Sequence, residues 1–273
     1  MTATASELRA IDVDRAGGGL VVRGVRDALA IAQRNLIAYR RVPQLLVFST
    51  IQPVVFVLMF RYVFGGAVGS YKGFPYVDFL MPGVFVQTVV FGSLATAIGL
   101  ATDLKSGLLE RFRSLPMARS AVLAGRTLAD LTRNVFVVVL MVLVGFLVGF
   151  RVHSNVFSFV AALLLVLLFG YAFSWVFAAV GLAVGDPETA QAAAFPVLAP
   201  LVFASTAFVP VESMPGWLQV WANHQPVSVT VSAVRDLTLG LPATTHLVQA
   251  VAWLVGLLLI FVPLSVRLYR RSV

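Results

Sequence analysis

Six stretches of the sequence are mostly apolar and about 20 residues or longer, which is the length that an α-helix needs to cross the hydrocarbon core of a bilayer. The chain is 59% hydrophobic and only 12% charged, so it carries more apolar surface than one aqueous core of this size can bury. Prolines inside the first and fifth stretches are tolerated where neighbouring groups satisfy the freed carbonyl. We predict an all-α integral membrane protein with six transmembrane helices, over about residues 43–64, 76–101, 123–150, 156–184, 190–209 and 247–266.

Positive charge is distributed unevenly between the two sides of these spans. With both termini in the cytoplasm, 15 of the 20 Lys and Arg residues lie on the cytoplasmic side and 4 lie outside, Arg133 being within the third span. Cytoplasmic loops of membrane proteins carry such an excess. We therefore predict a multi-pass protein with both termini cytoplasmic. Its parts are a flexible tail at 1–22, an amphipathic interfacial helix at 23–42, a transmembrane domain at 43–267 and a tail at 268–273.

The predicted interfacial helix has an apolar face opposite a basic one. Arg23, Arg34 and Arg41 share the basic face. Burial of the apolar face together with attraction to anionic headgroups explains this pattern fully. A docking role is additional and is not required by the pattern.

A second amphipathic helix is predicted at residues 104–115, between the second and third spans. Leu104, Leu108, Phe112 and Leu115 form its apolar stripe. Pro116 ends the helix, because the residue before a proline is pushed out of the α region. Such a helix fits a linker on the membrane surface and a partner's groove equally well.

Polar residues gather on one face of the third predicted helix. Arg126, Asp130, Arg133 and Asn134 lie there at helical spacing. A charge at the bilayer centre costs roughly 2.5–3.5 kcal/mol, so the cluster is less costly when paired and near a membrane end. It fits a helix that begins in the cytosol and carries its own salt bridges, or a polar gate at the inner mouth. We favour the first interpretation.

Three other polar positions have structural interpretations. Gln52 and Gln87 are amides within predicted spans, and we expect hydrogen bonds between helices there rather than contact with a substrate. Asp186 precedes Pro187 and Glu188, which is the pattern of an N-cap followed by a helix start.

The residues predict neither a metal site nor a catalytic site. The chain has no cysteine, and His153, His224 and His246 are scattered without ligand spacing. The glycine-rich residues 65–72 end in Tyr71-Lys72 where a phosphate-binding loop has Gly-Lys. The chain therefore cannot hydrolyse ATP by that route, and any energy that it uses must come from a partner or an ion gradient.

Two motifs in the chain are similar to those of a known family. The first is Leu108-Leu109-Glu110-Arg111-Phe112-Arg113-Ser114-Leu115-Pro116, followed by Arg119 and Gly125-Arg126. The second joins Val209-Pro210, Met214-Pro215-Gly216-Trp217-Leu218 and His224-Gln225-Pro226-Val227-Ser228, with Arg235 and Gly240 after them. With the length and the six spans, the chain resembles the ABC type-2 exporter permeases, in particular the daunorubicin-resistance-type subunits of actinobacterial drug and lipid exporters.

The resemblance implies a division of labour between subunits. Two copies of a separate ABC ATPase would bind ATP and Mg²⁺, whereas this chain would hold no cofactor and would not be an enzyme. The chain would form half of a permease dimer, with an identical or paralogous partner, in contact with membrane lipids and without nucleic acid. The 104–115 helix would be the coupling helix that docks on the ATPase, and the interfacial helix would also touch it. The docking residues would be Leu108, Glu110, Arg111, Phe112, Arg113, Leu115 and Pro116.

The resemblance also assigns the external segment Glu212–Pro242. In the family this segment dips into the outer leaflet as short helices and closes the exit, so Pro215, Trp217, Trp221 and Pro226 would form an external gate. From the residues alone, an external loop held at the headgroups by its tryptophans is the alternative.

We therefore expect ATP-driven export of an apolar or amphipathic drug, antibiotic or lipid across a bacterial cell membrane, along a path lined by the first, second and fifth spans. The alternative is a gradient-driven carrier or channel, which would need intramembrane acids away from the membrane ends. Asp78 lies near an outer end and Asp130 near an inner end, which disfavours it. A lipid-modifying enzyme would need clustered catalytic side chains at one depth, and the sequence indicates none.

Overall fold

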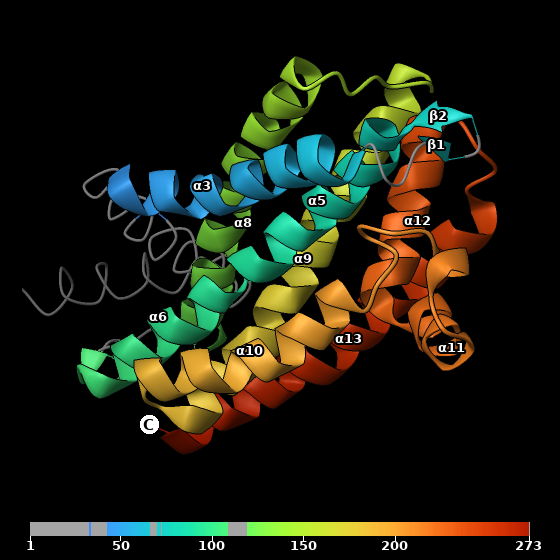
Figure 1. Cartoon of the computed structure of the whole chain (residues 1–273). Coiled ribbons are helices and arrows are strands. Elements are labelled where there is room, and N and C mark those ends of the chain that lie inside the picture. The colour runs from blue at the N-terminus through green and yellow to red at the C-terminus, as the bar shows by residue number, and fades with distance from the viewer. Residues whose placement is uncertain (1–32, 34–42, 66–69, 72, 109–118, 273) are drawn as a thin grey trace, which may run out of the picture.

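The computed structural model describes residues 33, 43–65, 70–71, 73–108 and 119–272 (Figure 1). Arg23, Arg34 and Arg41 of the predicted interfacial helix lie outside the described residues. The same holds for most of the predicted docking residues, namely Glu110, Arg111, Phe112, Arg113, Leu115 and Pro116.

The described chain is helical apart from a short hairpin and its connections. The strands β1 (Ser70–Tyr71) and β2 (Phe74–Pro75) pair antiparallel, with Ser70 opposite Pro75. The helices are α3 (Pro43–Met59), the π-helix η1 (Phe60–Phe64), α5 (Tyr76–Gly92), α6 (Leu94–Lys105), α8 (Arg119–Leu147), α9 (Val156–Val184), α10 (Pro187–Phe203), the 3₁₀-helix η2 (Val211–Ser213), α11 (Gly216–His224), α12 (Pro226–Leu239) and α13 (Thr244–Ser272).

Four helical segments of the described residues are long and apolar enough to cross a membrane: Tyr76–Lys105, Leu123–Leu147, Val156–Val184 and Thr244–Arg271. They confirm long helices at the second, third, fourth and sixth predicted spans. At the first and fifth spans the helices are shorter, with an apolar stretch at Thr50–Val63 and 17 residues in α10. The structure is thus that of a helical membrane protein, and a total of six spans stays a prediction.

The fifth predicted span ends early. α10 stops at Phe203 instead of Val209, because Ala204 leaves the helical region with φ −92 and ψ 40. The Ser205 hydroxyl donates to the Val202 carbonyl and accepts from the Ala207 amide, so a side chain takes over backbone hydrogen bonds at this end.

Two other boundaries move for local reasons. α8 ends at Leu147, before the predicted Phe150, where Gly149 adopts a φ of 101° that favours glycine. α13 continues to Ser272 and takes in residues predicted as a tail. Arg270 and Arg271 lie in its last turn, where positive charge stabilises the negative end of the helix dipole.

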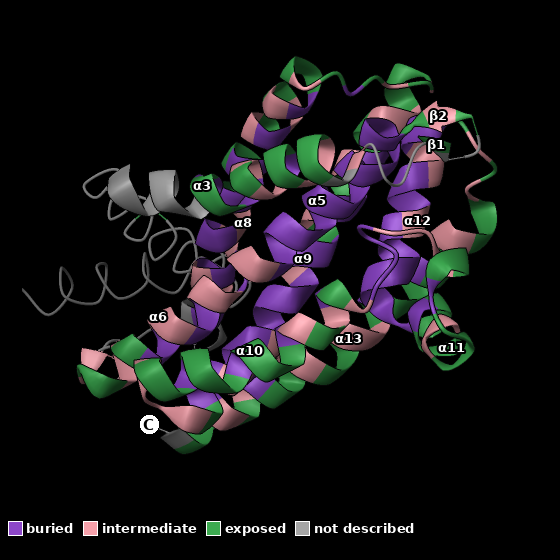
Figure 2. Cartoon of the chain, in the orientation of Figure 1, coloured by how far each residue is buried: buried purple, intermediate pink, exposed green. Residues whose placement is uncertain are grey.

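The helix α9 lies at the centre of the bundle and packs against α5, α6, α8, α10, α12 and α13 (Figures 1 and 2). α5 is buried along most of its length. By contrast, large apolar side chains are exposed on the outer surface, including Leu147 and Phe157 at 88% each and Leu259 at 71%. So much exposed apolar surface is typical of contact with lipid or with another membrane protein.

Two glycines permit close approach within the bundle. A Cβ at Gly83 of α5 would lie 2.1 Å from the carbonyl oxygen of Ala207, and one at Gly181 of α9 would lie 2.3 Å from that of Ala97 in α6. Small residues of this kind let membrane helices pack backbone to backbone. The α6–α9 contact therefore holds the second and fourth spans together.

Candidate functional site

A partly buried polar cluster joins α6 to α8 at one end of the bundle. Arg126 of α8 lies 3.5 Å from Asp103 of α6 and 3.9 Å from Asp130, four residues further along α8. The Arg126 guanidinium also donates to the Ala95 carbonyl of α6 at 3.3 Å. Asp130 is fully buried and accepts from the Thr96 hydroxyl of α6 at 2.5 Å. We name Asp103, Arg126 and Asp130 the ion-pair lock.

The lock depends on a glycine. A Cβ at Gly99 of α6 would lie 1.5 Å from Nη2 of Arg126, so the guanidinium crosses α6 where that helix has no side chain. Pairing of Arg126 with Asp130 agrees with the salt-bridged interpretation of the sequence cluster. The partners from α6 were not predicted, because residues 23 and 31 positions away give no local signal.

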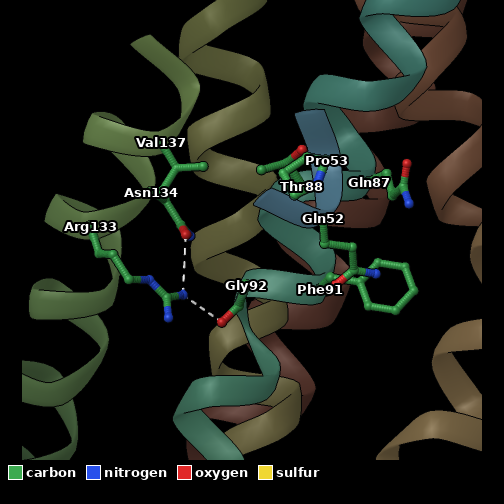
Figure 3. A pocket seen from close by; sticks show the side chains of 9 residues that line it. All are labelled: Gln52, Pro53, Gln87, Thr88, Phe91, Gly92, Arg133, Asn134 and Val137. Atoms are coloured by element: carbon green, nitrogen blue, oxygen red, sulfur yellow. Dashed lines mark hydrogen bonds between the residues drawn. The ribbon is translucent and has the colours of Figure 1, made fainter. Parts of the chain in front are cut away.

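Arg133, the third member of the predicted cluster, reaches a different place. Its guanidinium donates to the carbonyl of Gly92, where α5 ends, and to Oδ1 of Asn134 at 3.3 Å (Figure 3). A Cβ at Gly92 would lie 2.9 Å from that Asn134 oxygen and 3.0 Å from the guanidinium. The polar face predicted on α8 is thus divided between the ion-pair lock and a second site.

The second site is a cavity of about 100 Å³ between α3, α5 and α8 (Figure 3). Two amides that line it are buried and incompletely paired: among the described residues, Oε1 of Gln87 and Nδ2 of Asn134 have no hydrogen-bond partner. The interhelical bond expected of Gln87 is therefore not made at its oxygen. A buried polar atom without a partner costs about 1–3 kcal/mol. The rest of the lining comprises Gln52, Pro53, Thr88, Phe91, Gly92, Arg133 and Val137.

The predicted external segment forms two helices with different surroundings. Pro215 precedes α11, whose Trp217 and Trp221 are exposed at 75% and 47%. Pro226 begins α12, which is buried among α5, α9 and α13. An external loop held only by its tryptophans therefore does not describe residues 226–239.

The position of Arg235, on α12, differs from the one that we predicted. We counted it as a cation of an external loop, but only 4% of it is exposed. Its guanidinium lies 3.7 Å from the ring centroid of Phe79 and donates to the carbonyls of Phe79 and Thr206, at 3.1 and 2.8 Å. A cation over an aromatic face with carbonyl acceptors is stable when buried, and it ties α12 to α5.

The end of α6 differs from the predicted start of the coupling helix. Leu104 belongs to α6, which ends at Lys105, and Gly107 then turns the chain with a φ of 69°. Leu108 is helical again, and the rest of the predicted docking helix lies beyond the described residues. The apolar stripe predicted from Leu104 is thus interrupted, because glycine readily adopts this conformation.

A surface ion pair links the same end of α6 to the start of α10. Nζ of Lys105 lies 2.7 Å from Oδ1 of Asp186. Asp186 is the N-cap of α10, as predicted, and accepts from the Thr189 amide at 3.0 Å. The hydrogen bonds from Lys105 and Thr189 lower the pKa of the Asp186 carboxyl to about 2.

At the other end of the bundle, two histidines each pair with an aspartate of another element. His153 lies 2.8 Å from Asp78, which also accepts from the Arg151 amide at 2.8 Å. His246 lies 2.6 Å from Asp236. These pairs were not predicted, since each forms only when separate elements meet. Over the part of the chain that the structure describes, no three His, Asp or Glu side chains gather as metal ligands.

These features define a multi-pass helical membrane protein whose charged and amide side chains are buried between its helices. The ABC-2 type transporter family matches residues 26–239, and the chain belongs to that family.

Its relatives include the daunorubicin resistance ABC transporter permease protein DrrB1 of Streptomyces coeruleorubidus, 38% identical over 88% of this chain and 84% of its own length. The protein named probable doxorubicin resistance ABC transporter permease protein DrrC, of Mycobacterium tuberculosis, is 26% identical over 82% of this chain and 81% of its own length. The resemblance indicated by the two motifs is thereby confirmed, and the chain is an ABC transporter permease.

Proposed function

We propose that this chain is the membrane subunit of a bacterial exporter in which two copies of a separate ATPase bind ATP and Mg²⁺. A second permease, identical or paralogous, would complete the transmembrane dimer in the cell membrane, with both termini cytoplasmic. Membership of the ABC-2 type transporter family supports this proposal. The names of the relatives, which describe permeases of drug-resistance ABC transporters, support export of a drug or another amphipathic compound.

The ion-pair lock is the structural observation that carries the proposal. The stretch that we propose docks on the ATPase, residues 108–116, follows α6 and precedes α8. Asp103 in the last turn of α6 and Arg126 near the start of α8 pair across these two helices. A displacement of the docking stretch would therefore move α6 and α8 together. Lys105 and Asp186 extend the same connection to α10.

We propose that α11 and α12 close the exit side of the path. The exposed Trp217 and Trp221 on α11 suit a membrane interface, where tryptophan is enriched. Arg235 holds α12 against α5, so movement of α5 would be passed to this gate. The proposed gate residues Pro215 and Pro226 each mark the start of one of its helices.

We propose that the path lies between two permeases, against α3 and α10. We expected the second span to line it as well, but α5, the first part of that span, is buried within this chain. α3 and α10 carry exposed apolar side chains, among them Val55, Phe195 and Val197, which suit an apolar or amphipathic cargo. A gradient-driven carrier is less well supported. Such carriers use intramembrane acids to move ions, whereas the buried Asp130 and Asp78 pair with Arg126 and His153.

Co-purification with the ATPase tests the docking role. The chain is expressed with a candidate ABC ATPase sought among the neighbouring genes, and complex formation and ATP-dependent doxorubicin transport into inverted vesicles are measured. We expect Arg113→Glu to abolish the complex or the coupling. Arg267→Glu, the same charge change at the exposed end of α13, is the control and should leave both intact. Unchanged assembly and transport in Arg113→Glu would refute docking through this stretch.

A further inference from the structure

We propose that the cavity between α3, α5 and α8 is a recognition subsite for the hydrogen-bonding part of an exported aromatic amphiphile. This inference rests on the proposed function and adds to it a place in the bundle where the polar groups of the cargo are recognised. The cavity lies within the bundle: Gln87 and Asn134 are each only 2% exposed and belong to helices long enough to cross a membrane. On α3, Gln52 is exposed, so the cavity borders the outer surface of that helix.

The chemistry of the unpaired atoms specifies the ligand. Nδ2 of Asn134 is a donor and Oε1 of Gln87 is an acceptor, and neither has a partner among the residues described. Figure 3 shows Asn134 and Gln87 on different sides of the cavity, so one ligand would need two separate polar groups. Both atoms are almost inaccessible in this conformation, so the two amides would have to turn toward the cavity, which breaks no hydrogen bond of either atom. A carbonyl facing Asn134 and a hydroxyl facing Gln87 would then satisfy both amides. The Arg133 guanidinium in the lining disfavours an ammonium group at this place.

An aromatic cluster continues from the cavity and suits the apolar part of such a ligand. Phe91 lines the cavity and lies edge-on to Phe203 of α10, with ring centroids 6.4 Å apart. Phe208 stacks on Phe203 at 5.9 Å and on Phe60 at 4.5 Å. Phe203 is 46% exposed, so the cluster is open to a ligand at the surface of the bundle. Aromatic rings pack favourably on one another in offset or edge-on arrangements.

The cavity is large enough for the polar groups of such a ligand but too small for its aromatic body. About 100 Å³ accommodates a small polar group, whereas sites for whole drug-sized molecules are about 300–1,000 Å³. We infer that the hydroxyl and carbonyl groups enter the cavity while the planar body lies on Phe203. Ordered water is the competing occupant, because a polar cavity of this size also holds water.

Equilibrium binding to the purified permease tests the inference without the ATPase. Doxorubicin, a fluorescent planar compound with hydroxyl and carbonyl groups, is titrated against the permease in detergent, and its anisotropy gives Kd. We expect Asn134→Leu and Gln87→Leu each to raise Kd about fivefold, and the double variant to raise it about thirtyfold. Thr230→Val is the matched control. It removes a buried hydroxyl oxygen, also unpartnered among the described residues, from α12, and Kd should stay unchanged.

The outcomes separate substrate from water and this inference from the proposed function. Unchanged Kd in the double variant would overturn the inference, and a higher unfolding temperature of that variant would show that the cavity holds only water. A wild-type chain that binds no doxorubicin would overturn the substrate class. Binding that depends on Asn134 and Gln87 in a chain that shows no ATP-dependent transport would instead refute the proposed function alone.

Discussion

Two polar regions lie on the same helix, α8, and are built in opposite ways. In the ion-pair lock, the buried carboxylate of Asp130 has both a cation and a hydroxyl as partners. In the cavity, slightly further along α8, Asn134 leaves its amide nitrogen without a partner among the described residues. The charges of the lock face opposite charges, and Nε of Arg126, 3.9 Å from Asp130, is its one buried atom without a hydrogen bond among the described residues. The two places therefore differ in whether a charged partner faces their buried polar groups.

The difference separates a structural role from a recognition role. A network of paired charges holds helices in one arrangement, and loss of one member leaves an opposite charge without that partner. An apolar side chain of the same shape stabilises the fold at least as well as a buried polar group that has no partner. Stability should therefore respond strongly to changes in the lock and weakly to changes in the cavity, while ligand binding should respond in the opposite sense.

The largest expected effect comes from replacing Asp130. Asp130→Leu removes the fully buried partner of the partly buried Arg126 and should lower the free energy of unfolding by about 3 kcal/mol. Asn134→Leu should change it by less than about 1 kcal/mol, because the Arg133 guanidinium that loses Oδ1 of Asn134 keeps the Gly92 carbonyl as its acceptor. Thermal unfolding in detergent, followed by size-exclusion chromatography, measures both, with Thr132→Val at an exposed position of α8 as the control. Equal losses for the two Leu variants would remove the distinction between the regions.

A smaller effect is expected from the glycines that face each region. Gly99→Ala places a Cβ where the Arg126 guanidinium lies and should destabilise the fold by about 1–3 kcal/mol. Gly92→Ala meets only the ends of Arg133 and Asn134, at 3.0 and 2.9 Å, and should lose less than about 1 kcal/mol.

Gly256→Ala, at a position on α13 with open space around it, is the control for this pair. Unfolding temperatures measured side by side check the order of the three variants. If Gly99→Ala is as stable as Gly256→Ala, the position of Arg126 across α6 is wrong.

The smallest effect is expected at the exposed pair of Lys105 and Asp186, and it depends on pH. Since the folded pKa of Asp186 is lowered to about 2, its stabilising contribution is fully present above its ordinary pKa of 3.8. The contribution is lost as the pH falls through about 2. The unfolding temperatures of wild type and Asp186→Asn should therefore differ slightly at pH 5 and converge near pH 2. A difference that persists at pH 2, or that survives high salt undiminished, would contradict this assignment.

Local patterns in the sequence predicted the features that depend only on residues close together in the chain, such as helix caps and ion pairs within one helix. Asp186 followed by Pro187 predicted a cap that the structure contains. The spacing of Arg126 and Asp130 predicted an ion pair on one helix face. By contrast, the sequence offered no sign that Arg235 stacks on Phe79, 156 residues earlier, and we predicted this charge in an external loop. The cavity was missed because it needs three helices to form.

The sequence by itself determined that this protein lies in a membrane, where its long helices run and to which family it belongs. Hydrophobicity and capping act over one or two helical turns, so they can be read along the chain. Only the tertiary structure decided which buried polar groups are paired and which stay open, since partners such as Thr96 and Asp130 come from different helices. In a low-dielectric interior the free energy of burying a polar group depends on its partners, and the identity of one residue does not reveal them.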